Sequence, residues 1–124
     1  MSLTVQTEQR GDMVVVSVAG ELDMATAPQL QDQISDLLEK GRSRLVFNLA
    51  EVSFCDSTGL SVFVRAKNST DDAGGVVRLA APQRGVLRIL EVSGLVEVLH
   101  TYPTVDDAVT AQEPALDREP PFAR

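Results

Sequence analysis

The chain has 124 residues, of which 44% are hydrophobic, so it has room for one domain with a substantial apolar core. Its 11 basic and 18 acidic residues give a net charge of −7 and argue against a direct nucleic-acid partner, because binding a phosphate backbone needs clustered positive charge. One cysteine excludes an internal disulfide and a metal site built from cysteines, and no apolar run approaches the roughly 20 residues that span a bilayer.

The first two predicted elements are strands. Residues 3–8 alternate weakly between apolar and polar side chains, and residues 13–20 are dominated by β-branched residues. Between them, residues 10–12 read Arg-Gly-Asp, which is typical of a turn. We therefore expect an antiparallel hairpin.

An amphipathic helix is predicted next. Thr26 is a candidate N-cap, Pro28 suits the first helical turn, and Gly41 should end the helix. One face of this helix carries the apolar residues Leu30, Ile34, Leu37 and Leu38. That face should pack against the sheet.

The middle of the chain predicts a buried strand, a loop and a second helix. Residues 45–49 form a short apolar run that suits a strand buried on both faces. Residues 50–56 are expected to form a loop, and a helix should begin directly after it. Residues 71–75 should end this helix.

The last third of the domain predicts a strand at residues 76–80, a helix opened by Pro82 and ended by Gly94, and a strand at residues 96–100. A short helix capped by Thr104 should close the domain. The residues expected to pack inward from the helix after Pro82 are Val86, Leu87, Leu90 and Val92.

From Glu113 onward, three of the six prolines occur beside scattered charges, so residues 112–124 are predicted to be a disordered tail after a domain at residues 1–111. The order of elements predicts an α/β fold with one mixed sheet of about five strands and about four helices packed against it. Strands linked by helices should be parallel, and the opening hairpin antiparallel.

The junction of the third strand with the second helix is the strongest candidate for a site. Loops that leave the carboxyl ends of parallel strands usually hold the sites of such sheets, and residues 48–59 include one. Either Asp56 or Ser57 can cap the helix, and a cap by itself needs no further function. The free N–H groups of a helix start also tolerate a phosphate on Ser57, because they favour negative charge.

Four blocks of this sequence closely resemble the anti-sigma factor antagonists of the STAS domain class, and the resemblance runs from about residue 3 to residue 109. The blocks are Val-Ala-Gly-Glu-Leu-Asp at 18–23, Ala-Pro-Gln-Leu at 27–30, Leu-Val-Phe-Asn-Leu at 45–49 and Val-Ser-Phe-Cys-Asp-Ser-Thr-Gly-Leu at 52–60. The resemblance implies a mixed sheet with packed helices and a switch serine at the start of the second helix. Here that serine is Ser57.

The resemblance also implies a mechanism. The unphosphorylated protein would bind an anti-sigma factor that is also a serine kinase, and would thereby free a sigma factor for transcription. The kinase would phosphorylate Ser57 from ATP and release its antagonist, and a serine phosphatase would reset the switch. ATP and magnesium belong to the kinase, so no cofactor is expected on this chain.

Five residues form the expected partner-binding set. The family's pattern puts the switch on the first hydroxyl after the aspartate, which makes Ser57 the acceptor and Thr58 its neighbour. Asp56 would orient Ser57 or contact the kinase, or would simply cap the helix. Gly59 would let a partner approach closely or would relieve crowding, and Asp23 would be a contact in a neighbouring loop or a solvated turn residue.

Enzymatic alternatives have little support in the residues. A nucleophilic Ser57 would need a base, and the only histidine, His100, lies at a predicted strand end, with no orienting partner evident from the sequence. Residues 55–59 also lack the glycine that a nucleophile elbow has two positions before the serine. The sequence has no glycine-rich phosphate loop, so nothing in it indicates nucleotide binding. Cys55 lies in an apolar run and is expected to be a buried structural thiol. The chain is therefore not expected to be an enzyme.

Two alternatives stay within the domain class. Similar domains occur as regulatory tails of anion transporters, which the lack of membrane spans disfavours, and as scaffold components of stress-sensing complexes. The scaffold alternative stays open.

The first residues have no signal peptide and the lone cysteine suits a reducing compartment, so we expect a cytoplasmic protein without a membrane partner. A monomer or weak dimer is sufficient for a chain that offers one face to a kinase.

Overall fold

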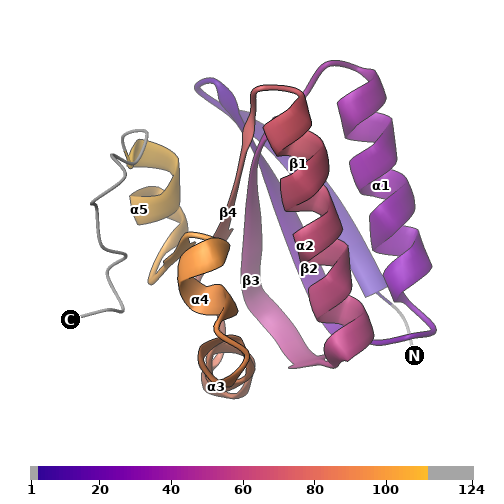
Figure 1. Cartoon of the computed structure of the whole chain (residues 1–124), viewed down its shortest axis with the longest axis vertical. Helices are drawn as coiled ribbons and strands as arrows, with labels where there is room; N and C mark the ends of the chain where they lie inside the picture. Colours follow the sequence, from indigo (N-terminus) through magenta and orange to yellow (C-terminus); the bar gives the residue numbers. More distant parts are fainter. Residues whose placement is uncertain (1–2, 112–124) are drawn as a thin grey trace.

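Five strands form one mixed sheet in the order β1-β2-β3-β4-β5 within residues 3–111, the part of the chain that the computed structural model describes (Figure 1). The strands are β1 (Leu3–Arg10), β2 (Met13–Leu22), β3 (Arg44–Cys55), β4 (Val76–Ala80) and β5 (Thr101–Tyr102). The helices are α1 (Ala27–Glu39), α2 (Ser57–Asp72), α3 (Arg84–Val92), α4 (Leu95–Val98) and α5 (Val105–Thr110). The predicted tail at residues 112–124 lies outside the described residues.

The strand directions are those predicted. The β1–β2 hairpin is antiparallel and runs from the pair Leu3 and Gly20 to the pair Arg10 and Met13, with Gly11 in the turn at φ +63°. The neighbouring pairs β2–β3, β3–β4 and β4–β5 are all parallel. Parallel neighbours need crossover connections, and α1, α2 and the α3–α4 segment supply them. The α/β fold with a mixed five-stranded sheet is therefore confirmed.

Both faces of the sheet are covered. Alternate side chains of a strand point to opposite faces, so one strand can contribute to a buried cluster on each side. In β2, Val14, Val16 and Val18 belong to the larger buried cluster, whereas Met13 and Val15 belong to a second one. Helices α1 and α2 lie side by side over the face that carries the larger cluster, and α5 lies on the other side of the sheet (Figure 1).

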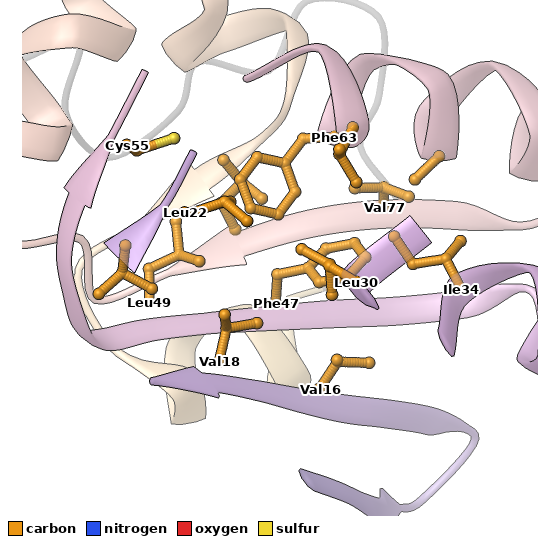
Figure 2. Packing of buried hydrophobic residues seen from close by; sticks show 14 of the residues in the cluster. Val16, Val18, Leu22, Leu30, Ile34, Phe47, Leu49, Cys55, Phe63 and Val77 are labelled. Carbon is orange, nitrogen blue, oxygen red and sulfur yellow. The ribbon is translucent and has the colours of Figure 1, made fainter. Parts of the chain in front are cut away.

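The larger core runs the length of α1 and α2. Phe47 of β3 and Phe63 of α2 pack at its centre with ring centroids 5.1 Å apart. Figure 2 shows Leu22, Leu49 and Cys55 at one end of this core. That end lies beneath the start of α2, so tight packing there fixes the position of the helix start.

The predicted loop at residues 50–56 is wrong, because β3 continues to Cys55. This second half of β3 still pairs with β2, from Glu51 opposite Ala19 to Cys55 opposite Leu22, with one register shift before Glu51 and a second one after Val52. The shifts interrupt the alternation of buried and exposed side chains, so the segment lacks the regular pattern of a strand. The long strand carries the start of α2 well beyond the end of β4.

The predicted strand at residues 96–100 is also wrong. The chain turns at Gly94, where φ is +77°, and forms the short helix α4 before the two-residue β5. The described chain thus has five helices, one more than predicted. Helix α3 begins at Arg84 rather than at Pro82, and Val92, expected to pack inward, is 76% exposed.

Two helix ends test the capping predictions. Thr104 caps α5 as predicted, since its hydroxyl accepts a hydrogen bond of 3.0 Å from the backbone N–H of Asp107. Thr26 precedes α1, but its side chain does not cap the helix. Its hydroxyl donates to the carbonyl of Glu21 at 2.7 Å and accepts from the N–H of Asp23 at 3.0 Å, so it braces the preceding turn instead.

Candidate functional site

The candidate site is the start of α2. Asp56 is the N-cap, and its Oδ1 accepts a hydrogen bond of 3.0 Å from the backbone N–H of Gly59. Ser57 is the first helical residue and its side chain is exposed. Within residues 3–111 no side-chain hydrogen bond holds the Ser57 hydroxyl. Of the two candidate caps, Asp56 therefore takes the structural role and leaves Ser57 free.

Loss of the Asp56 cap should destabilise the domain. We expect Asp56→Ala to lower the free energy of unfolding by about 0.5–2 kcal/mol, because the N–H of Gly59 loses its acceptor. Asp56→Asn keeps an acceptor oxygen at the same place and is the matched control. Urea unfolding monitored by circular dichroism measures both, and equal losses for the two variants would contradict the capping role.

Gly59 is buried where α2 meets the ends of β2 and β3. A Cβ atom at this position would lie 2.8 Å from the Sγ of Cys55, 2.8 Å from the Cγ of Leu22 and 3.0 Å from the Leu22 carbonyl oxygen. All three distances are shorter than ordinary van der Waals contact. Packing inside the domain therefore requires a glycine here. Of the two roles expected for Gly59, this is the relief of crowding.

The loop after β2 lies against the start of α2. The backbone N–H of Asp56 donates to the carbonyl of Leu22 at 3.2 Å, so Asp23 follows directly beside the helix start. The Asp23 Oδ1 accepts hydrogen bonds from the N–H groups of Ala25 at 2.9 Å and Thr26 at 3.1 Å. Asp23 is thus a turn residue that shapes its own loop. The structure brings Asp23, Asp56 and Ser57 to one end of the sheet.

His100 lies away from this site. It precedes β5, whose Thr101 is level with Leu79 of β4, and Leu79 is in turn level with Phe47 of β3. Ser57 follows the far end of β3, most of a long strand beyond Phe47. The histidine therefore cannot act as a base for Ser57. In residues 3–111 no group of three histidine, cysteine or acidic side chains could hold a metal ion.

A family model of the STAS domain matches residues 4–108. This chain belongs to the STAS domain family. The anti-sigma-B factor antagonist of Bacillus subtilis (strain 168) is 32% identical over 99 residues, which cover 80% of this chain and 90% of that protein.

Solved structures give the same family. An anti-sigma factor antagonist from Mycobacterium paratuberculosis is 33% identical, with a TM-score of 0.81 over 88% of this chain and 92% of that one. The Bacillus cell fate determinant SpoIIAA in its phosphorylated form is 26% identical, with a TM-score of 0.62 over 74% of this chain and 85% of that one. This STAS domain is therefore similar to named anti-sigma factor antagonists. Separately, no helix within residues 3–111 is long and apolar enough to cross a membrane.

Cys55 of this STAS domain is a buried thiol, 1% exposed, directly before Asp56. Burial, and then the charge of Asp56, raise its pKa from an ordinary value of 9.0 to about 12. The thiol is therefore protonated and poorly nucleophilic at neutral pH.

Cys55 should react with thiol reagents only when the domain unfolds. At pH 8 we expect modification to be slow in buffer and fast in urea, which a colorimetric thiol assay measures. The domain should also lose stability as pH rises above about 9, because the unfolded chain gives up the thiol proton before the folded one does. Rapid modification of the folded protein would contradict this account.

Exposed apolar residues flank the site of this STAS domain, and the sequence-based prediction missed them. Met24 is 75% exposed in the loop after Asp23, and Phe54 is 49% exposed two residues before Asp56. They are two of the four large hydrophobic residues that are exposed within residues 3–111. Their only signal in the sequence is an apolar residue between polar neighbours, which by itself is common on protein surfaces.

Proposed function

We propose that this STAS domain is an anti-sigma factor antagonist that is switched by phosphorylation of Ser57. In its unphosphorylated form it binds a cognate anti-sigma factor, which is also a serine kinase, and so frees a sigma factor. Phosphorylation of Ser57 by that kinase releases this chain from the anti-sigma factor, and a serine phosphatase restores the active, unphosphorylated form. The observation that carries the proposal is the exposed, unbonded hydroxyl of Ser57 at a helix start that Asp56 already caps.

The local chemistry supports a switch that leaves the fold intact. A phosphate on Ser57 would point to solvent from the first residue of α2, where the helix dipole favours negative charge. It would add about −1.5 to −2 charges beside Asp56. A partner packed closely on this spot would lose contacts and would have to bury the charged phosphate beside Asp56, so it would dissociate while the domain stays folded.

The proposed contact surface combines the two adjoining segments at this end of the sheet. Asp23, Asp56, Ser57 and Thr58 would face the kinase, while Gly59 acts by letting α2 pack closely below them. The net charge of −7 favours a partner with a basic or neutral surface. The kinase would supply ATP and magnesium, and this chain can act as a monomer or weak dimer.

The test is phosphorylation by candidate anti-sigma factor kinases from the same genome, in ATP and magnesium. Intact-mass analysis and peptide mapping should find one phosphate, on Ser57, that is absent from Ser57→Ala. Thr58→Ala is the matched control and should still be phosphorylated. A phosphate on Thr58, or no phosphorylation by any candidate, would contradict the proposal.

A further inference from the structure

A groove between α1 and α2 adjoins the switch serine. It has a volume of about 250 Å³, and Met24, Pro28, Thr58 and Val62 line it. Val62 is 2% exposed and forms its floor, whereas Met24 is 75% exposed at its rim. Thr58 links the groove to the switch, since it follows Ser57 directly. The volume is below the roughly 300–1,000 Å³ of small-molecule sites, and suits one or two side chains of another protein.

Two charged residues flank the apolar lining of the groove. Asp32 of α1 and Arg65 of α2 are both exposed and both line it. Within residues 3–111 neither forms an ion pair, although Asp36 of α1 pairs with Lys40 directly after the helix and Lys67 pairs with Asp71 in α2. Opposite charges are thus available on the two sides of the groove.

A buried polar atom adds a third feature. Gln31 also lines the groove, and its Oε1 is buried without a hydrogen-bond partner in the described part of the chain. A buried acceptor without a donor is costly. A small rotation of this half-buried side chain would present the oxygen to a donor from a bound partner.

We propose that the groove between α1 and α2 holds an amphipathic helix of the anti-sigma factor, which inserts an apolar side chain beside Met24 and over Val62. This inference rests on the proposed function and names the partner chemistry of the same surface. The bound helix carries a basic residue that faces Asp32 and an acidic residue that faces Arg65. A third helix between two packed helices is a common mode of peptide recognition.

The position of the groove argues for this occupant. A kinase that holds Ser57 for phosphoryl transfer must cover the start of α2, and Thr58 makes the groove continuous with that surface. A second copy of this chain is disfavoured, because each copy carries a net charge of −7. Docking in the groove would also hold the kinase in one orientation relative to Ser57.

The first test compares the affinities of variants for the kinase that phosphorylates Ser57, measured by calorimetry with ADP. Met24→Asp should weaken binding by about tenfold or more, because it puts a charge into an apolar contact. Val92→Asp is the matched control, since Val92 is 76% exposed on α3 and does not line the groove, and should change binding by less than about twofold. Arg65→Glu should weaken binding, whereas Arg88→Glu on α3 should not.

The second test places a photo-crosslinking phenylalanine analogue at position 24. Crosslinking to an amphipathic helix of the anti-sigma factor supports the inference, whereas crosslinking to a second copy of this chain, or to no helix of the kinase, overturns it. If the wild type binds and Met24→Asp binds equally well, the groove inference fails alone. If the wild type neither binds nor is phosphorylated, the proposed function fails and the inference falls with it.

Discussion

Ser57→Asp is expected to bind the anti-sigma factor about 30- to 150-fold more weakly than the wild type, while the domain keeps its stability. An acidic side chain at the first position of α2 suits the helix dipole, so the fold is not harmed. A close-packed partner would have to bury this added charge beside Asp56, and a shift of roughly 2–3 kcal/mol corresponds to this change in affinity. Calorimetric titration of the anti-sigma factor measures the affinity, and urea unfolding measures the stability.

Ser57→Ala is the control for this prediction. It should bind like the wild type and resist phosphorylation. Its free energy of unfolding should change by no more than about 0.5 kcal/mol, because Asp56 and not Ser57 supplies the cap. Equal affinities of the wild type and Ser57→Asp would contradict the electrostatic part of the account.

Gly59→Ala is expected to lower the free energy of unfolding by about 1–3 kcal/mol. The added Cβ would lie 2.8 Å from both the Cys55 Sγ and the Leu22 Cγ, and both side chains are buried in a close-packed core, where shifting them is costly. The contact of 3.0 Å with the Leu22 carbonyl oxygen also disturbs the acceptor of the Asp56 N–H. Urea unfolding gives the loss of stability.

Gly85→Ala is the matched control. Gly85 lies in α3, and a Cβ atom there meets nothing within 4 Å. Its replacement should leave stability unchanged or raise it by up to about 1 kcal/mol, since alanine favours a helix. If Gly59→Ala were as stable as the wild type, the start of α2 could shift without cost, and the close packing beneath the switch would not position Ser57.

Local patterns predicted most of the fold. The hairpin around Gly11 and the apolar face of α1 depend on short-range signals, namely a turn residue and a helical period, and both are observed. The second half of β3 depends instead on pairing with β2 across two register shifts. Bulges of this kind break the period of two along the strand, so the sequence of residues 50–55 resembles a loop.

The segment after α3 shows a similar limit. Residues 96–100 are rich in β-branched and apolar residues, which favours a strand, but four residues from Leu95 form one helical turn instead. The turn is closed by the hydrogen bond from the N–H of Leu99 to the carbonyl of Leu95 at 2.9 Å. Tertiary packing, which buries Leu99 completely, decides between the two structures.

The candidate site was predictable in its position but not in its details. Asp56 and Ser57 are both good capping residues, so their order alone does not tell which one caps; the extended backbone at Asp56 decides it. Met24 and Gln31 contribute to a groove that exists only once α1 packs beside α2. No local pattern could have paired them with Thr58.

The most direct test of the switch adds the chain to a preformed complex of the anti-sigma factor with its sigma factor. Release of a labelled sigma factor is followed by fluorescence anisotropy, with ADP in place of ATP so that no phosphorylation occurs during the titration. The account predicts release by the unphosphorylated chain and none, at the same concentrations, by the chain phosphorylated on Ser57. Equal release by both forms, or release by neither, would contradict it.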